Sequence, residues 1–430
     1  RIKQEYQFIE DSIQALKSQH FTYQSKSGKN DFKGETSVHY SNYIINPTFP
    51  KKFFKNEVAI TTQEAYDRDS TYWDKIRPEP LTIKEQRYQF IKDSLYAVTH
   101  SEHYLDSIDS VYNKITFMDI LWDGINITNR KKKQRIGFSS LLAMVDIFEI
   151  TSLRFGPNVD YFKKWENEKY LFTYANANVG LRNGDIKGMF WLNYRYDPMH
   201  SGFLSFYAGN QFEMLVENDA LTNLFVRDNW IELNETNVGW SRELVNGVFL
   251  SSKVIFEERK PINGYKFGSI TEDWFGGNQA SSFEMYQSLS IKSRISYTPF
   301  QKYMTEPYRK IVLGSKWPTF SVYYEKGLDN ILGSDINFDF IASAITQKFK
   351  LGTMGTSSYL IKYGKFLNTE DLRYADFKIF PRGDKYFFAS LMQSMQLQDT
   401  TLTVKDAFVQ IHYTHHFNGA IINFIPLVKK

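Results

Sequence analysis

The chain has 430 residues, with 52 Lys and Arg against 48 Asp and Glu, a net charge of +4 and no Cys. The lack of Cys excludes disulfide frameworks, Cys-ligated zinc or iron–sulfur sites and Cys nucleophiles. The small net charge gives no electrostatic reason to expect a nucleic-acid partner. At 50.5 kDa the chain is long enough for about two or three domains, or for one large barrel.

Aromatic residues are abundant, with 36 Phe, 28 Tyr and 8 Trp. The mean hydropathy is −0.43. No uncharged apolar run approaches the roughly 18 residues of a membrane helix, which excludes a helical membrane bundle. A transmembrane β-barrel remains compatible, because its strands alternate lipid-facing and lumen-facing residues and its aromatic side chains gather at the two water–lipid boundaries.

The two ends of the sequence suggest a segment of a longer protein. Arg1 opens directly into an amphipathic stretch, without an initiator Met or a signal-peptide pattern. The last residues, 425–430, complete neither a helix nor an obvious strand.

The pattern up to about Asn129 is mixed. Residues 2–16 have helical periodicity, and the polar, aromatic stretch 21–54 favours irregular structure or short strands. We therefore expect a first helix at the N-terminus, followed by a region with little regular structure.

A capping signal predicts the next helix. Pro78 and Pro80 favour extended backbone, and Thr82 with Glu85 three residues on forms a capping box, so a helix should begin near Ile83. Its apolar face would carry Tyr88, Ile91 and Leu95, and a second helix should run from Ser101 to about Val111. Together they predict a helical hairpin near residues 83–114.

From about Gly137 the period becomes that of a strand and stays so for most of the remaining chain. Turn signals punctuate the runs at residues 183–185, 197–198, 263–264, 276–278, 352–355 and 418–419. A soluble β-sandwich or propeller would produce the same alternation. Several runs reach about nine or more residues, the length that crosses a bilayer in a barrel. Their polar faces carry full charges suited to a wet lumen, which favours a membrane barrel.

The predicted fold class is all-β: an antiparallel transmembrane β-barrel over residues 136–430, incomplete at its C-terminal end, after a small mixed, partly helical periplasmic segment over residues 1–135. The lipid-facing candidates are Phe190, Leu192, Tyr194, Tyr196, Leu289, Ile291, Ile295, Tyr297, Val409, Ile411 and Tyr413. The lumen-facing candidates are Lys253, Arg259, Lys292, Arg294 and His412. Tyr194, Tyr196, Tyr297, Tyr323, Tyr324 and Tyr363 could form interfacial belts, with carbohydrate stacking as the alternative.

One sharp basic run stands where the period changes: Arg130, Lys131, Lys132, Lys133 and Arg135. It could contact anionic headgroups at the periplasmic rim of the membrane, worth about 1 kcal/mol per residue. A solvated linker is the alternative.

The sequence carries no recognisable catalytic or cofactor motif. It has no P-loop, no Gly-x-Ser-x-Gly, no His-Glu-x-x-His and no dinucleotide fingerprint. His412 and His416 would lie roughly 13 Å apart on one strand, with His415 on the other face, so one strand cannot chelate a metal with all three. Glu257 and Glu258 should point to opposite faces. No catalytic residue, metal site or cofactor is therefore predicted.

Several motifs resemble a Bacteroidota outer-membrane family of unknown function, whose members are often labelled carboxypeptidase-regulatory-like-domain-containing proteins. The matching motifs are residues 72–82 (YWDKIRPEPLT), 93–94, 104–106, 112–114, 146–150 (DIFEI), 227–230 (RDNW), 380–388 (FPRGDKYFF), 415–420 (HHFNGA) and 425–427 (IPL). They extend over nearly the whole chain.

The resemblance implies an outer-membrane barrel of a Gram-negative bacterium with its N-terminal part in the periplasm. Family members begin with an Ig-like regulatory module and continue past the Ile-Pro-Leu motif, so both ends here look truncated. The Asn-x-Val-Glu-Gly stretch of the first barrel strands is not legible between Phe155 and Gly180, which leaves the register of those strands open. The label describes a β-sandwich module without a protease site and implies no peptidase activity.

These observations predict a non-enzymatic accessory or scaffold subunit of an envelope machine, concerned with outer-membrane protein assembly, secretion or lipoprotein display. The expected partners are outer-membrane lipids and other barrels or lipoproteins. A stand-alone channel or transporter is the first alternative, with charged residues lining its water-filled path. An outer-membrane hydrolase is the second, with catalytic residues converging from different strands.

Overall fold

The computed structural model describes residues 1–9, 13–28, 30–51, 53–147, 151, 153–215, 227–267, 279–383, 390–398 and 401–422. They form two compact units, one of residues 1–55 and 63–94 and the other of residues 56–62 and 95–430. The chain is mostly β and contains a large antiparallel sheet, which confirms this part of the predicted fold class.

The first unit contains a three-stranded antiparallel sheet of β1 (Ile2–Ile9), β2 (Ile13–Ser27) and β3 (Asn30–His39). The helix expected over residues 2–16 is therefore wrong. Ile2 pairs with Phe21, and β2 continues the ladder to β3. These backbone partners lie many residues away along the chain, so the local spacing of apolar residues could not reveal them.

The helices of this part are α1 (Gln63–Asp67), α2 (Ser70–Ile76) and α3 (Ile83–Thr99), the last extending into the second unit. Two of these three helices, α2 and α3, begin at side-chain caps. The predicted capping box is confirmed: the Thr82 amide donates to Glu85 Oε2 at 2.8 Å, and the Glu85 amide donates to Thr82 Oγ1 at 3.3 Å. No helix of the described residues is long and apolar enough to cross a membrane.

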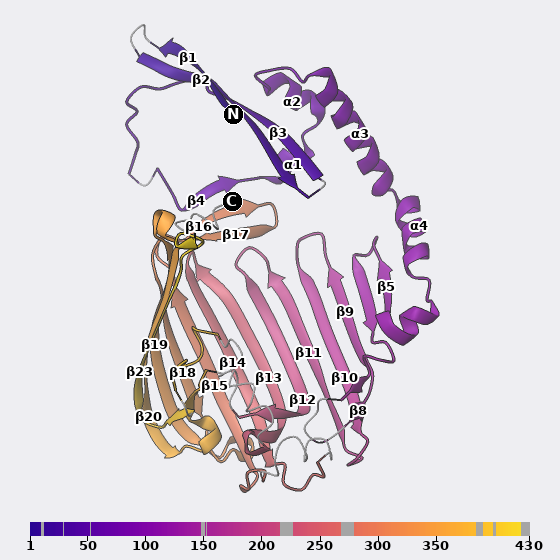
Figure 1. Cartoon of the computed structure of the whole chain (residues 1–430), viewed down its shortest axis with the longest axis vertical. Coiled ribbons are helices and arrows are strands. Elements are labelled where there is room, and N and C mark those ends of the chain that lie inside the picture. The colour runs from indigo at the N-terminus through magenta and orange to yellow at the C-terminus, as the bar shows by residue number, and fades with distance from the viewer. Residues whose placement is uncertain are drawn as a thin grey trace. The chain divides into compact units, whose positions relative to one another are not determined.

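The second unit is built on one antiparallel sheet whose main strands follow chain order (Figure 1). They are β5 (Ile125–Asn129), β6 (Gln134–Phe138), β9 (Asn158–Lys164), β10 (Tyr170–Gly180), β11 (Ile186–Asp197), β12 (Gly202–Met214), β13 (Trp230–Val245), β14 (Val248–Pro261), β15 (Tyr286–Tyr297), β18 (Thr319–Gly327), β19 (Asn337–Lys350), β20 (Thr356–Asp371) and β23 (Ala407–His416). The short β7 (Val145–Asp146) and β8 (Arg154–Phe155) attach beside β10.

The sheet is open, and the described residues form no closed barrel. Its two edge strands are β5 and β23, and no pairing among the described residues joins them. The sheet also begins earlier than predicted, because the boundary between residues 135 and 136 falls inside β6. Both β5 and β6 have five residues, too few to give a clear alternation, and β6 is held by pairing with β9, where Arg135 faces Phe162.

Smaller elements connect these strands. A parallel pair joins β4 (Glu57–Ile60) to β16 (Lys302–Glu306), which pairs with β17 (Arg309–Gly314). A second short pair is β21 (Lys378–Phe380) with β22 (Leu402–Val404). Single helical turns lie at η1 (Asp119–Asp123), η3 (Arg227–Asn229), η4 (Ile331–Gly333), η5 (Gly352–Met354) and η6 (Tyr374–Asp376).

The second predicted helix is α4 (Glu102–Tyr112), capped by Ser101, whose hydroxyl accepts from the Tyr104 amide at 3.3 Å. Neither α3 nor α4 has a buried residue, and Leu95 is 60% exposed. Both predicted helices are thus present, and α4 binds the β5–β6 turn. Asn113 of this helix end donates to Thr128 O at 2.8 Å and accepts from the Thr128 amide at 2.9 Å.

Most predicted turns lie between strands. Residues 183–185 connect β10 to β11, residues 197–198 follow β11, and residues 352–355 connect β19 to β20. Gly184 and Gly355 have φ values of +69° and +118°, which an L side chain rarely adopts. The turn expected at 276–278 lies outside the described residues.

Candidate functional site

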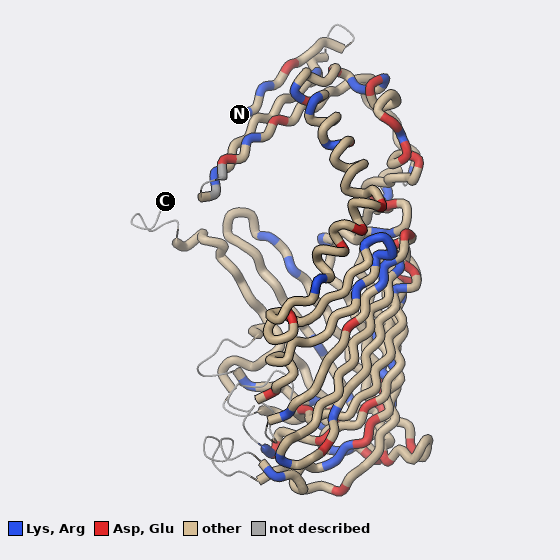
Figure 2. Tube along the Cα trace, turned by 90° about the vertical axis from the view of Figure 1, so that its right-hand side faces the viewer, with Lys and Arg blue, Asp and Glu red and all other residues tan. Residues whose placement is uncertain are grey.

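The two faces of the sheet in the second unit differ in chemistry. Cross-strand partners share a face, so the register assigns Ile361, Ile345, Phe320 and Tyr297 to one side. This outer face carries exposed apolar side chains on consecutive strands: Phe190, Leu204, Val238, Val254, Ile295, Phe320, Val322, Ile341, Ile361, Val409 and Ile411. Figure 2 shows charged residues gathered toward the two ends of the strands, with a mostly uncharged band between them.

The lipid-facing candidates of β11, β15 and β23 lie on this outer face. They are Phe190, Leu192, Tyr194, Tyr196, Ile291, Ile295, Tyr297, Val409, Ile411 and Tyr413. Leu289 must be corrected: it is 6% exposed, because the segment after η4 lies against it and Ser334 Oγ accepts from its amide at 2.9 Å. Tyr323 is a second correction, since it lines an interior cavity while the next residue, Tyr324, turns outward.

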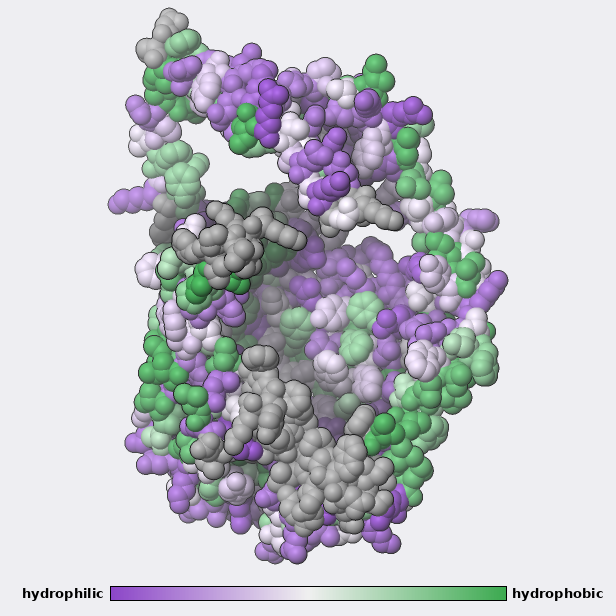
Figure 3. Space-filling model, viewed as in Figure 1, coloured by the Kyte–Doolittle hydropathy of each residue, from purple (hydrophilic) through white to green (hydrophobic). Residues whose placement is uncertain are grey.

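The concave face of the sheet is polar and hollowed. Figure 3 looks into it, and hydrophilic purple and white prevail there, whereas green gathers along the two sides of the sheet. Two cavities of about 590 and 790 Å³ lie on this face and share Lys292, Tyr323, Lys362 and Lys378 among their lining residues. We take these adjoining cavities as the candidate functional site.

The lumen-facing candidates lie on this concave face. Arg259 and Lys292 line the first cavity, and Lys253, Lys292 and Arg294 line the second. Each of three forms an ion pair: Lys253 with Glu235 at 3.4 Å, Lys292 with Glu325 at 3.3 Å, and Arg259 with Asp376 at 2.7 Å.

His412 is the remaining lumen-facing candidate. It is 6% exposed, and its Nδ1 lies 3.0 Å from Leu391 O. Its ring is therefore covered by the segment that follows β21, and it does not line either cavity.

The described parts of the connection between β20 and β23, residues 372–383, 390–398 and 401–406, lie partly against the concave face, which was not predicted from the sequence. Asp376 bonds to Arg259, and Lys378 of β21 forms an ion pair with Glu325 of β18. Phe380 packs edge-on against Phe408 of β23, with ring centroids 4.7 Å apart. The motif at 380–388 had suggested only a family resemblance, and its residues 384–388 lie outside the described part of the chain.

A buried polar network fixes one end of the sheet. Glu243 of β13 is 1% exposed and accepts from Lys310 Nζ at 2.7 Å, Gln301 Nε2 at 2.9 Å and the Gly247 amide at 2.9 Å. Because Lys310 belongs to β17, this carboxylate ties the β16–β17 hairpin to the β13–β14 turn. A second network joins Lys187 of β11, Glu232 of β13 and Tyr265.

The basic run forms the turn between β5 and β6 and is largely neutralised. Arg130 pairs with Asp109, Lys131 with Asp106 at 2.8 Å and Glu102 at 3.2 Å, Lys133 with Glu166 at 2.7 Å, and Arg135 with Asp160 at 2.8 Å. Asp106 and Glu102 raise the pKa of Lys131 above its usual value. The Lys132 amide donates to Asn129 Oδ1 at 2.8 Å. The run therefore holds α4 against the sheet. Neither the membrane-rim interpretation nor the linker interpretation of the sequence included this role.

Among the described residues that line the two cavities there is no His to serve as the base of a Ser nucleophile. Ser357 Oγ lies 2.8 Å from His415 Nδ1, which resembles a nucleophile and its base, but Ser357 is fully buried and His415 Nε2 faces Met354 O. Glu257 and Glu258 lie on opposite faces, bonded to Arg259 and Lys260 respectively. Among the described residues, no group of three or more acidic or His side chains is placed to hold a metal ion.

Comparison with known proteins gives one match. Residues 118–430 match the model of the C-terminal domain of a family of unknown function, DUF5686. No curated protein and no solved structure matches the chain significantly. The match begins just before β5, so it spans the whole sheet of the second unit. The resembling motifs at 148–150 and 425–427 lie outside the described residues.

Proposed function

The chain belongs to the DUF5686 family, and we propose that it is an outer-membrane β-barrel-type protein of a Gram-negative bacterium, of the Bacteroidota, that serves as a non-enzymatic accessory or scaffold subunit of an envelope machine. The observation that carries this proposal is the contrast between the faces of one sheet. Apolar side chains cover the outer face from β11 to β23, and ionised side chains line the concave face. Lipid-facing and lumen-facing residues alternate in this way along each strand of a membrane β-barrel.

The apolar outer face argues against a water-exposed sheet. Exposed apolar surface costs about 25 cal/mol per Å² in water, and soluble monomers rarely expose contiguous apolar patches beyond a few hundred Å². Phe300 and Trp317, whose rings lie 5.9 Å apart, are both exposed near strand ends. Aromatic residues at such positions suit the boundary between lipid and water.

The edge strands β5 and β23, each unpaired on one side among the described residues, give a reason to expect that a membrane-inserted sheet belongs to a complex. Lipid cannot satisfy the unpaired backbone groups of an edge strand, so the proposal requires further strands, from this protein or from a partner, between β5 and β23. A sheet that is completed or covered by other chains is expected of a scaffold subunit.

Residues 374–380, which attach to the concave face, help to decide between the scaffold role and the channel role. Lys378 and Asp376 attach residues 374–380 to the concave face of β18 and β14, inside the space through which a solute would pass. The cationic cavities favour the channel alternative, because a wet charged interior suits anion passage. The attached segment favours a closed interior, and we therefore rank the scaffold first and the channel second.

Gentle detergent purification of the tagged full-length protein from its native outer membrane tests the proposal. Mass spectrometry of the co-migrating proteins should recover other barrels or lipoproteins at a fixed stoichiometry. A tagged unrelated barrel, purified in parallel, controls for carry-over in detergent. Recovery of the protein alone would contradict the subunit role, and bilayer conductance of that material would then test the channel.

A further inference from the structure

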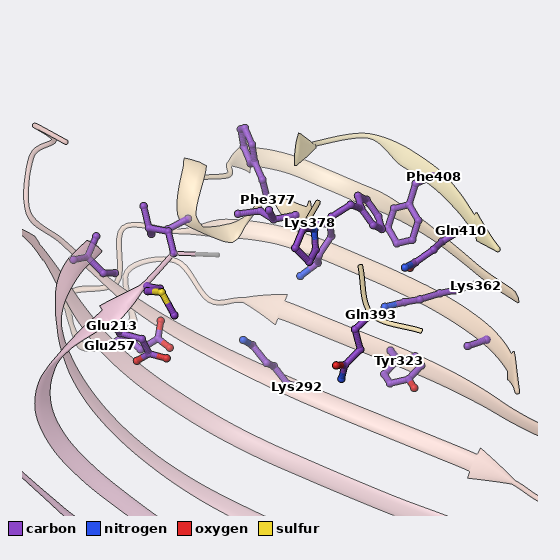
Figure 4. A pocket seen from close by; sticks show the side chains of 18 of the residues that line it. Glu213, Glu257, Lys292, Tyr323, Lys362, Phe377, Lys378, Gln393, Phe408 and Gln410 are labelled. Carbon is purple, nitrogen blue, oxygen red and sulfur yellow. The ribbon is translucent and has the colours of Figure 1, made fainter. Parts of the chain in front are cut away.

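Cationic side chains converge on the second interior cavity. Lys253, Lys292, Arg294, Lys362 and Lys378 line it, and Glu325 is the one carboxylate among the described lining residues. They come from β14, β15, β20 and β21, which lie far apart in the sequence. Figure 4 shows the adjoining first cavity, in which Lys292, Lys362 and Lys378, which line both cavities, direct their amino groups toward a common space, with Glu213 and Glu257 at its other end.

The carboxylates nearby do not balance this charge. Lys292 and Lys378 share Glu325, and Lys253 pairs with Glu235. In the described part of the chain, no ion pair joins Arg294 or Lys362 to a carboxylate. Among the described residues, Arg294 and Lys362 are therefore the lining cations without a carboxylate partner.

Tyr323 holds the two cations that lack a carboxylate. The guanidinium carbon of Arg294 lies 4.9 Å from the centroid of its ring, and Lys362 Nζ lies 5.3 Å from the same centroid. Arg294 also donates to Ser321 Oγ at 3.2 Å. Cation–π contacts are worth roughly 0.5–2 kcal/mol each, so one aromatic ring fixes two like charges without neutralising them.

We propose that this cavity binds a small solute with a phosphate group, held between Arg294 and Lys362 beside Tyr323. Two adjacent cations without a carboxylate partner favour an anion with more than one negative charge. The forked guanidinium of Arg and the point charge of Lys are both suited to phosphate oxygens. The volume of about 790 Å³ admits a ligand of sugar-phosphate size, and the hydroxyl groups of Ser205 and Ser241 can bond to its uncharged part.

The site does not rest on the proposed membrane role, because the same cavity would bind an anion in a sheet that never meets lipid. The phosphate could belong to a soluble sugar phosphate or to a lipid headgroup. Three probes separate these sources: inorganic pyrophosphate, a hexose phosphate, and phosphatidic acid in mixed micelles. The matching neutral hexose is the control for binding without charge.

Titration calorimetry tests the site on the full chain, purified in a nonionic detergent and a phosphate-free chloride buffer. We expect saturable binding of pyrophosphate or the hexose phosphate. Arg294→Gln and Lys362→Gln should each weaken binding about tenfold, and the double variant should lose it. Lys365→Gln is the matched control, because Lys365 lies on the same strand but faces outward, opposite Ile341. Circular dichroism of every variant verifies the fold.

The outcomes are distinct. Tighter binding of the hexose phosphate than of pyrophosphate would identify a soluble sugar phosphate, and binding of phosphatidic acid alone would identify a lipid headgroup. Failure of the wild type to bind any probe would overturn the proposal. Equal losses in Lys362→Gln and Lys365→Gln would also overturn it, since they would indicate general charge attraction rather than a site.

Discussion

Ile361 and Lys362 are consecutive residues of β20 that lie on opposite faces of the sheet. Ile361 is 41% exposed on the outer face, and Lys362 lines both interior cavities. A shift of the strand by one residue would exchange the two faces and bring charge to the apolar side. The contrast between neighbours therefore depends on the register of every strand pair from β11 to β23.

The first prediction concerns the same contrast on β15. Ile291→Arg should place a charge against lipid near the middle of the strand, which costs about 2–4 kcal/mol and impairs insertion. Lys292→Ala should insert normally, because Glu325 keeps its ion pair with Lys378. The inserted fraction, measured by heat-modifiable migration of membrane extracts, checks both. Similar behaviour of the two variants would show that the faces are wrongly assigned.

The second prediction concerns the buried Glu243. In Glu243→Gln, an amide group replaces the carboxylate that accepts from Lys310, Gln301 and the Gly247 amide. Lys310, whose side chain is 10% exposed, then lacks a carboxylate partner. Breaking a buried ion pair by removing one partner costs about 3–5 kcal/mol of unfolding free energy. Glu258→Gln is the control, because its partly exposed pair with Lys260 should contribute less than about 1 kcal/mol.

Denaturant titration followed by Trp fluorescence measures both losses. The account of Glu243 fails if the two variants have the same unfolding midpoint. It is strengthened if Glu243→Gln also makes the β16–β17 hairpin sensitive to protease.

The third prediction concerns the attachment of α4. Asp109 accepts from the Arg130 amide at 2.8 Å and pairs with its guanidinium. Asp109→Asn should release this helix locally, so that amide hydrogen exchange over residues 102–112 becomes faster while exchange in β11–β15 is unchanged. Glu102→Gln, whose side chain is 86% exposed, is the control and should have little effect. Unchanged exchange in Asp109→Asn would show that the turn does not hold the helix.

Strand alternation was readable from the sequence where it is local. The faces of β11, β15 and β23 follow from neighbouring residues such as Ile291 and Lys292. Leu289 fits the same pattern, but η4 and the residues after it, which cover it, follow more than 40 residues later in the chain. The strand pairing of residues 2–16 and the pairing of β4 with β16 also depend on distant partners.

The candidate site was only half predictable for the same reason. Lys253, Lys292 and Arg294 stood out as the charged face of their strands. Lys362 and Lys378 did not, because they become neighbours of those residues only through the sheet order and the position of β21 on the concave face. Tyr323 looked like one of six boundary tyrosines, and its role beside Arg294 is visible only in three dimensions.

The fourth prediction is a pH dependence at the start of α3. Hydrogen bonds from the Thr82 hydroxyl and amide lower the pKa of Glu85 below its usual 4.5. A lowered pKa means that the carboxylate stabilises the folded cap above the unfolded pKa, and that this stability is lost as the pH falls through the folded pKa. Amide protection of residues 83–86 should therefore drop between about pH 6 and about pH 3.

Hydrogen exchange, corrected for intrinsic rates, measures this change. Glu85→Gln retains an accepting oxygen but no titrating group, so its protection should be equal at both pH values. The same pH response in Glu85→Gln would assign the effect to another residue.

The most direct measurement of the central claim is a labelling scan along β20 in native membranes. Because the chain has no Cys, single Cys variants at Leu360, Ile361, Lys362 and Tyr363 can each carry one environment-sensitive fluorophore. The account predicts that labels at Ile361 and Tyr363 are quenched by spin-labelled lipid, and that labels at Leu360 and Lys362 are quenched instead by aqueous iodide. Equal quenching of all four labels by iodide, with none by lipid, would contradict a membrane-spanning sheet with its apolar face toward lipid.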